Sequence, residues 1–183
     1  LKEIVRLLPQ ARILCIGDIM LDRFVRGVVE RISPETPVPV LRFSGESIMP
    51  GGAGNVAANL RALGCPVLFL GVTGKDVDGD ALEQLLSAGG VRHRLARSES
   101  WITTVKTRFV ADNHHLLRFD KERRGLMSQA EEAFILENLN ESLAGYDAVL
   151  LSDYNKGVLT DSLTRKIIAV CRTRGKPVMV DPK

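Results

Sequence analysis

The segment of this chain that most clearly suits ligand binding has three glycines within four positions, Gly51, Gly52 and Gly54, directly before Asn55. Glycine lacks a Cβ atom, so the backbone at these positions can pass close to a ligand. A helical pattern begins here, and the first N–H groups of a helix are unpaired and carry the positive end of its dipole. Asn59 shares a helix face with Asn55 because the two are four residues apart. These features suit a ligand with hydroxyl or phosphate groups, although a glycine-rich turn that only leads into a helix is the alternative.

Two carboxylates follow the first predicted strand, which spans residues 12–17. Asp18 stands at the carboxyl end of that strand and Asp22 follows four residues later. Ligands of open α/β sheets bind at the carboxyl ends of the strands. Asp18 is therefore a candidate ligand-binding residue. For Asp18, a capping or turn role is the alternative.

Cationic side chains form a second group of candidates. Lys106 and Arg108 are two residues apart on a predicted strand, so they point to the same side of it. Two such cations can hold one phosphate, and arginine offers a bidentate contact; a solvated strand face is the alternative. Asp153 and Lys156 follow another predicted strand and could orient a substrate or neutralise a phosphate, unless they only form a turn.

An alternation of strands and helices positions these residues. Apolar runs predict strands and 3.6-residue periodicity predicts helices, and the order of the two predicts an α/β fold with a mostly parallel sheet. Ser128 and Glu131 have the spacing of a capping box at the start of one helix. The predicted strands are 12–17, 67–72, 147–152 and 177–181, and the predicted helices are 52–63, 78–88, 128–143 and 160–174.

Two segments, approximately 22–45 and 101–120, depart from this alternation. The second has a period of two and predicts two strands that turn at Asp112-Asn113. The first contains three prolines, which suit edges and turns. Together they predict a small sheet that stands off the main one. The chain ends directly after a predicted strand, which would leave an unpaired edge, so we expect residues 1–183 to be the first part of a longer domain.

The composition limits the classes of function. The chain has 183 residues, 45% of them hydrophobic and 26% charged, which fits one globular domain. A net charge of +3 does not indicate a nucleic-acid partner. There is no apolar run of membrane-spanning length and no secretion signal, so we expect no membrane partner and a cytoplasmic location. Neither the three cysteines nor His93, His114 and His115 have the spacing of a metal site, and we expect none.

The glycines at 51–54, followed by Gly64 and Gly74, resemble the first signature of the ribokinase-like (PfkB) carbohydrate kinases. Nearly the whole chain is similar to one branch of that family, the D-glycero-β-D-manno-heptose 7-phosphate kinases. Further stretches carry this likeness: Gly17-Asp18-Ile19-Met20-Leu21-Asp22, Arg31-Ile32-Ser33-Pro34-Glu35-Thr36-Pro37-Val38-Pro39-Val40, Thr104-Val105-Lys106-Thr107-Arg108, Leu151-Ser152-Asp153-Tyr154-Asn155-Lys156-Gly157 and Val180-Asp181-Pro182-Lys183.

The resemblance implies a three-layer α/β/α fold with a β-sheet lid, of which residues 1–183 form the N-terminal part. It implies transfer of the γ-phosphoryl group of ATP, with Mg²⁺, to the anomeric hydroxyl of heptose 7-phosphate. The product would be the 1,7-bisphosphate, a precursor of ADP-heptose for the lipopolysaccharide core. A homodimer formed through the lid and a fused adenylyltransferase domain downstream are also implied.

The same resemblance assigns roles by position. Asp22 matches the sugar-binding aspartate, and Gly51, Gly52 and Asn55 match the sugar-contact loop. Lys183 ends a motif that meets the ATP phosphates. The general-base aspartate of the family lies in a Gly-Ala-Gly-Asp motif, which we expect beyond Lys183, so the chain holds no catalytic residue and is expected to be inactive alone.

Other readings remain open at this point. Another PfkB-family kinase for a sugar or sugar phosphate fits the same motifs. A non-catalytic carbohydrate- or nucleotide-binding module fits the absence of the base motif from this chain. A dinucleotide-binding Rossmann domain is disfavoured, because the glycines do not follow the first strand and Gly-x-Gly-x-x-Gly is absent.

Overall fold

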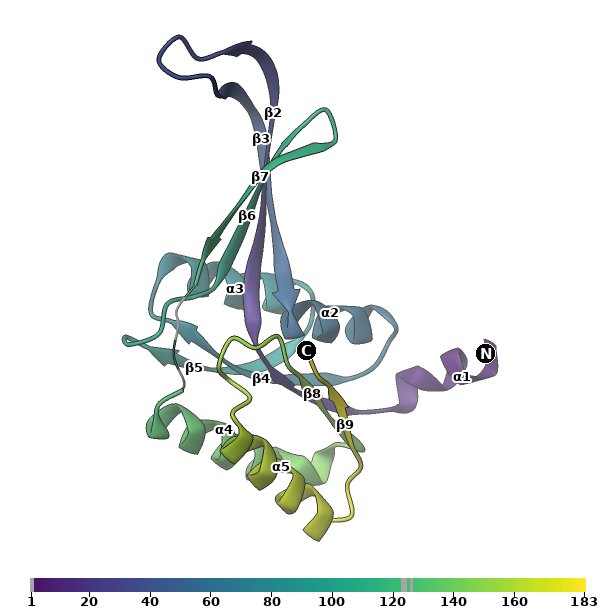
Figure 1. Cartoon of the computed structure of the whole chain (residues 1–183). Helices are drawn as coiled ribbons and strands as arrows, with labels where there is room; N and C mark the ends of the chain where they lie inside the picture. Colours follow the sequence, from purple (N-terminus) through teal and green to yellow (C-terminus); the bar gives the residue numbers. More distant parts are fainter. Residues whose placement is uncertain (1, 123–124, 126) are drawn as a thin grey trace.

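The main sheet has five parallel strands in the order β5-β4-β1-β8-β9. The structure is a computed structural model that describes residues 2–122, 125 and 127–183. Figure 1 shows this sheet across the lower half of the molecule. Its strands are β1 (Ile13–Gly17), β4 (Val67–Gly74), β5 (Arg92–Ser98), β8 (Ala148–Ser152) and β9 (Val178–Asp181).

Helices cover both faces of the main sheet, which gives three α/β/α layers (Figure 1). In β1, Cys15 packs in the core under α2 and α3, whereas Leu14 and Ile16 pack in the core with α4 and α5. This alternation follows from the period of two in a strand that is buried on both faces. The helices are α1 (Lys2–Leu7), α2 (Ala53–Ala62), α3 (Val77–Ala88), α4 (Gln129–Ser142) and α5 (Asp161–Thr173), with short 3₁₀ turns at Leu8–Gln10 and Leu143–Gly145.

A second sheet of four strands, in the order β3-β2-β6-β7, rises from the body of the molecule (Figure 1). We call it the lid sheet; it consists of β2 (Ile19–Ile32), β3 (Pro39–Gly52), β6 (Val105–Ala111) and β7 (His114–Lys121). Strands β2 and β6 are parallel, and the two outer pairs are antiparallel. The β6–β7 turn has positive φ at Asp112 (45°) and Asn113 (65°), residues that tolerate this region.

The α/β class and the separate small sheet predicted from the sequence are confirmed, with differences at the boundaries. The lid strands extend further than expected, because β2 begins at Ile19 and β3 continues to Gly52. Strand β5 was not predicted: it starts Arg92-His93-Arg94, and a cationic edge strand lacks the apolar run used to find buried strands. The capping box at Ser128 and Glu131 is present.

At the other edge of the main sheet, β9 carries Met179 and Val180 with about half of each side chain exposed (49% for both). This edge is unpaired within the described residues, as the sequence led us to expect. Among the helices that the structure describes, none is long and apolar enough to cross a membrane.

Strand β3 passes directly into α2 through Gly52, which has φ 58° and ψ −135°. A Cβ atom at this position would lie 2.5 Å from the carbonyl oxygen of Asp18 and 2.7 Å from the Met20 side chain. The backbone conformation and the lack of space both require glycine here. The junction therefore places the start of α2 against the end of β1.

We expect Gly52→Ala to lower the free energy of unfolding by about 1–3 kcal/mol, because alanine is strained in this backbone region. Urea denaturation would measure the change. Gly145→Ala is the matched control, since a Cβ atom there meets nothing within 4 Å. Equal stability of the two variants would contradict the argument.

Candidate functional site

The candidate site lies where the carboxyl ends of β1 and β8, the start of α2 and the base of the lid sheet come together. The backbone of Asp18 joins two of these parts, because its carbonyl oxygen accepts the Ala53 N–H at 2.9 Å and its N–H donates to the Ser152 carbonyl at 3.3 Å. The Tyr154 ring lies against Gly52, with Cδ2 3.5 Å from where a Cβ atom would stand. Segments distant in the sequence are therefore in contact here.

The Asp18 side chain is 1% exposed and holds the loop that follows β8. Its Oδ2 accepts the N–H groups of Tyr154 at 2.9 Å and Lys156 at 3.1 Å, and its Oδ1 accepts the N–H of Val158 at 3.0 Å. Three backbone donors on one carboxylate fix the path of residues 153–158. The structure thus gives Asp18 a loop-positioning role, and direct contact of Asp18 with a sugar stays a prediction.

Burial raises the pKa of Asp18, and the three backbone hydrogen bonds oppose that rise without cancelling it. A carboxylate with a raised folded-state pKa binds its proton more tightly in the folded state than in the unfolded chain. Its contribution to the free energy of unfolding therefore increases as pH falls through the folded-state pKa. At neutral pH the buried charge costs stability, which the backbone donors partly offset.

The glycines before α2 bring the second aspartate close to the helix start. A Cβ atom at Gly51 would collide with Oδ2 of Asp22, so this carboxylate lies directly against the glycine backbone. Asn55 is the third residue of α2 and is half-buried, and its side chain makes no hydrogen bond within the described chain. Asp22 and Asn55 thus offer polar groups beside a helix start, where a polyol could bind.

Side chains of one face of the lid base converge on this place, and we call that face the front face. Asp22 on β2 and Lys106 on β6 are direct cross-strand partners. Arg108 donates to Oδ1 of Asp22 at 2.5 Å, and its guanidinium carbon lies 5.1 Å from the centre of the Phe24 ring. Arg108 is thereby held by a carboxylate and an aromatic ring together.

Lys106 differs from Arg108, because it forms no ion pair with a carboxylate of the described residues. Burial lowers the pKa of Lys106, and the nearby charge of Lys156 lowers it further. Lys156 itself is paired through Nζ with Glu122 at 2.5 Å. Lys106 on the front face and Lys156 on the loop after β8 therefore influence each other, and of the two only Lys156 has a carboxylate partner among the described residues.

Residues 10–183 match the pfkB family of carbohydrate kinases, which covers almost the whole chain. The chain belongs to that family. Its fold agrees, since it superposes on a carbohydrate kinase from Agrobacterium tumefaciens with a TM-score of 0.67 at 22% identity, covering 93% of this chain and 53% of that one. Phosphofructokinase-2 from Escherichia coli, solved in complex with fructose-6-phosphate, gives a TM-score of 0.72 at 18% identity, covering 94% and 55%.

Two curated relatives are more similar in sequence, and both are named bifunctional protein HldE. The protein from Mesorhizobium japonicum is 45% identical over 172 residues, which are 93% of this chain and 35% of the relative. The protein from Hyphomonas neptunium is 46% identical over 173 residues, which are 94% and 36%. The chain therefore spans about a third of the length of these relatives and about half of the solved kinases.

The structure brings most of the sequence-predicted residues of this PfkB chain together. Asp153 belongs to the Asp18-bound loop, where its Oδ1 accepts the Asn155 N–H at 2.7 Å. Lys183 follows β9 and is exposed, and no described contact joins it to the cluster. One set of residues forms a connected cluster, beside which Asn55 lies on the first turn of α2: Asp18, Asp22, Gly51, Gly52, Lys106, Arg108 and Lys156.

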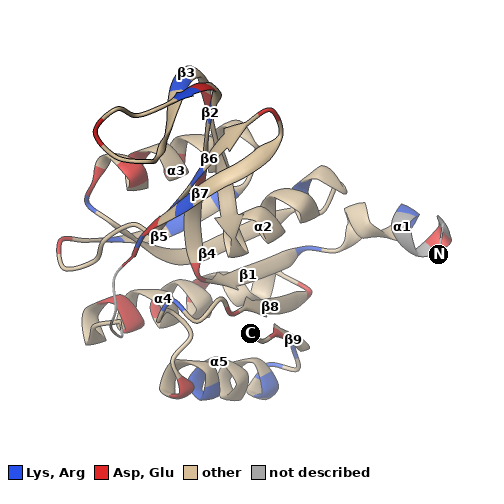
Figure 2. Ribbon diagram, turned by 45° about the horizontal axis from the view of Figure 1, so that its top comes forward, with Lys and Arg blue, Asp and Glu red and all other residues tan. Residues whose placement is uncertain are grey.

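Four polar or aromatic neighbours of this cluster were not predicted: Phe24, Arg118, Asp120 and Glu122. Arg118 and Asp120 face Arg108 and Lys106 across the β6–β7 hairpin, and Figure 2 shows charged segments of both signs at its base. Counting back from the Asp112-Asn113 turn would have missed this pairing by one residue, because the register of the hairpin shifts between Phe109 and Val110. No sequence signal predicts the Lys156–Glu122 contact. The described residues contain no group of three or more His, Cys, Asp or Glu side chains that could hold a metal ion.

We expect Asp18→Asn to loosen the 153–158 loop, because an amide places its NH₂ group against at least one of the three backbone donors. Hydrogen exchange at Tyr154, Lys156 and Val158 should become faster. Asp153→Asn is the matched control, since an amide oxygen can still accept the Asn155 N–H. Unchanged exchange in Asp18→Asn would show that the carboxylate does not hold the loop.

Proposed function

We propose that this chain is the sugar-binding part of a kinase that phosphorylates the anomeric hydroxyl of D-glycero-β-D-manno-heptose 7-phosphate. The donor is ATP and the product is the 1,7-bisphosphate, for the synthesis of ADP-heptose and the lipopolysaccharide core. The PfkB family match and the 45% identity to proteins named HldE support this proposal. The observation that carries it is the arrangement of two cations at the lid base: Lys106 is the cross-strand partner of Asp22, and Lys156 reaches the end of β7 through its ion pair with Glu122.

The residues of this chain bind and orient the sugar. Asp22 and Asn55 hydrogen-bond its hydroxyl groups, and the amides at the start of α2 supply further donors. Lys106 and Lys156 take the 7-phosphate, whose charge relieves the repulsion between the two ammonium groups. Arg108 keeps Asp22 in place and adds positive potential, while Asp18 positions the loop that carries Lys156 and Asp153.

The nucleotide half of the reaction depends on residues outside this cluster. Mg²⁺, when bound, neutralises the charge of the ATP phosphates during in-line transfer. We assign no Mg²⁺ ligand here, because no described group of acidic residues fits one. Lys183 is the proposed contact to the ATP phosphates, and the general base lies in a part of the enzyme that this chain does not contain. We propose that the activity belongs to the full-length enzyme and that the reaction, which consumes ATP, takes place in the cytoplasm.

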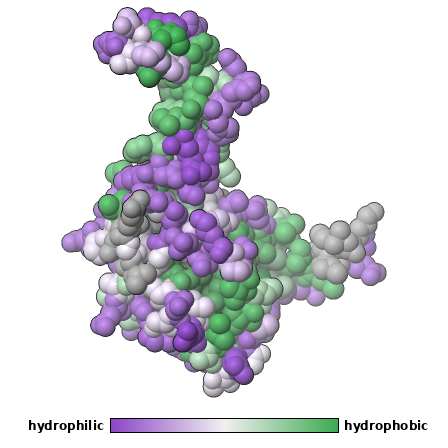
Figure 3. Space-filling model, viewed as in Figure 1, coloured by the Kyte–Doolittle hydropathy of each residue, from purple (hydrophilic) through white to green (hydrophobic). Residues whose placement is uncertain are grey.

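The lid sheet is the proposed dimer interface. Its strands carry large apolar side chains with most of their surface exposed, including Phe43 (64%) and Leu117 (60%). An open hollow of about 390 Å³ lies among the lid residues Val38, Pro39, Leu41, Phe109, Leu116 and Leu117. Figure 3 shows hydrophobic surface along this projecting sheet. Burial of such a surface against a second copy of the chain would be favourable.

A fused adenylyltransferase domain downstream of this chain is also proposed, in agreement with the bifunctional name of the relatives.

We expect Lys106→Met in the full-length enzyme to raise the KM for heptose 7-phosphate by roughly tenfold to a hundredfold, the range for one charged hydrogen bond. The same variant should have little effect on phosphorylation of heptose without the phosphate. Coupled ADP-release assays would measure both. Lys166→Met is the control, because that lysine lies on α5 and pairs with Glu132. A wild-type enzyme that uses the unphosphorylated heptose equally well would favour another PfkB kinase.

Leu117→Glu in the lid sheet should convert the dimer to a monomer, because a charge in an apolar interface is costly. Sedimentation velocity of the full-length enzyme would measure the mass. Leu63→Glu is the control, since that leucine is also half-exposed (48%) but follows α2, away from the lid. A variant that remains dimeric would exclude the lid as the interface.

A further inference from the structure

Three of the four lid strands are attached to the first turn of α3 by hydrogen bonds or ion pairs. Asp78 lies in this turn, and its side chain is 7% exposed. Its Oδ1 accepts from Nη2 of Arg23 on β2 at 3.0 Å, and its Oδ2 accepts from Nζ of Lys121 on β7 at 2.8 Å. One buried carboxylate therefore joins two strands of the lid base to the body of the protein.

The third strand, β6, is tied to the same turn by the residue two positions before it. The Thr103 N–H donates to Oδ2 of Asp76 at 3.0 Å, and Thr103 Oγ1 accepts the Gly74 N–H at 2.9 Å. Asp76 is also the N-cap of α3, since its Oδ1 accepts the Gly79 N–H at 2.8 Å. The start of β6 is thus fixed to the cap of the helix that carries Asp78.

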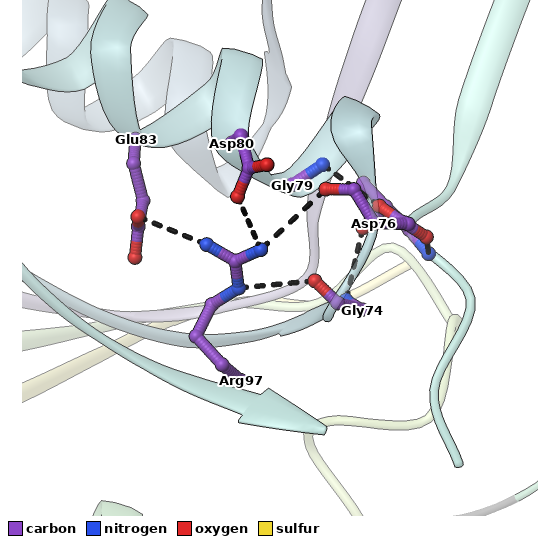
Figure 4. Close-up of polar contacts among 7 residues, drawn as sticks. Gly74, Asp76, Gly79, Asp80, Glu83 and Arg97 are labelled. Atoms are coloured by element: carbon purple, nitrogen blue, oxygen red, sulfur yellow. Dashed lines mark hydrogen bonds and ion pairs between the residues drawn. The ribbon is translucent and has the colours of Figure 1, made fainter. Parts of the chain in front are cut away.

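A guanidinium on β5 makes this helix start rigid (Figure 4). Arg97 donates through Nε to the Gly74 carbonyl at 3.0 Å, and its two terminal nitrogens meet Asp80 at 2.6 Å and Glu83 at 2.9 Å. Arg97 is less exposed than either acid, at 23% against 59% and 37%. The lid strands are therefore attached to a turn that is itself held to the main sheet.

The pleat of the lid sheet links this anchor to the candidate site. Arg23 and Lys121 point to the back face, toward α3, whereas Asp22 and Asp120, their neighbours in sequence, point to the front face with Lys106. Because adjacent residues of a strand move together, an anchor on the back fixes the height and tilt of the groups on the front. Among the described residues, no hydrogen bond or ion pair joins the side chains of Asp78, Arg23 and Lys121 to Asp22, Lys106 or Arg108.

We propose that Asp78 is a positioning residue, which holds β2 and β7 so that Asp22 and Lys106 face the sugar phosphate at the right distance from α2. This inference rests on the proposed function for its kinetic consequence, whereas the anchoring itself does not. Arg23 has a second partner in Glu46 at 2.9 Å, but Lys121 forms no other ion pair among the described residues. Loss of Asp78 would leave Lys121 without a counter-charge and β7 without its tie to the body.

The test is Asp78→Asn, which keeps the shape of the side chain and removes its charge. In the ligand-free protein, hydrogen exchange should become faster in β2, β6 and β7 near the base and stay unchanged in β1. In the full-length enzyme, the KM for heptose 7-phosphate should rise between about twofold and thirtyfold, the usual range for indirect coupling, with kcat and the KM for ATP unchanged. Asp161→Asn is the matched control, because it removes a first-turn aspartate of α5.

A second variant, Lys121→Gln, tests the same anchor if Asp78→Asn does not fold. It should change exchange and KM in the same direction, and the effects of the two substitutions should be less than additive in the double variant. Unchanged lid exchange, or a lower kcat with an unchanged KM, would overturn the proposal. A wild-type enzyme without kinase activity would refute the proposed function alone, since the exchange measurement requires no catalysis.

Discussion

The buried carboxylate of Asp18 is the interaction on which the candidate site depends. Its side chain gathers three N–H groups of the loop after β8, while its carbonyl oxygen accepts the N–H of Ala53 at the start of α2. A charge at 1% exposure is unfavourable without partners, and the backbone donors are what make it tolerable. One residue thus sets two walls of the site relative to the end of β1.

The lid sheet performs two tasks because its strands present different residues on their two faces. The front face carries Asp22, Lys106 and Arg108 beside the start of α2, and the back face carries Arg23 and Lys121 against α3. A shift of one residue in register would move every side chain of a strand to the opposite face. Both sets of contacts would then be lost, so the register of the lid strands is fixed. This constraint explains how a projecting sheet can contribute to a precise site.

The charges of the front face and of the neighbouring loop after β8 are distributed unequally. Arg108 is neutralised by Asp22 and Lys156 by Glu122, so Lys106 is the cation of this group without a carboxylate partner in the described chain. Such an arrangement favours one added anion more than a fully paired surface would, because a phosphate on Lys106 displaces no existing ion pair. It is compatible with a sugar phosphate as the substrate of a PfkB kinase.

The sequence alone determined the α/β class, the separate lid and the identity of the glycine turn, because strand and helix periods and glycine spacing are local properties. It did not reveal β5, whose arginines and histidine resemble a solvated segment, nor the partners of Arg108 and Lys156. The role of Asp18 as a loop anchor and that of Asp78 as a lid anchor also came only from the tertiary structure. Each depends on backbone or side-chain groups between 43 and 140 residues away, and no local pattern encodes which distant segments meet.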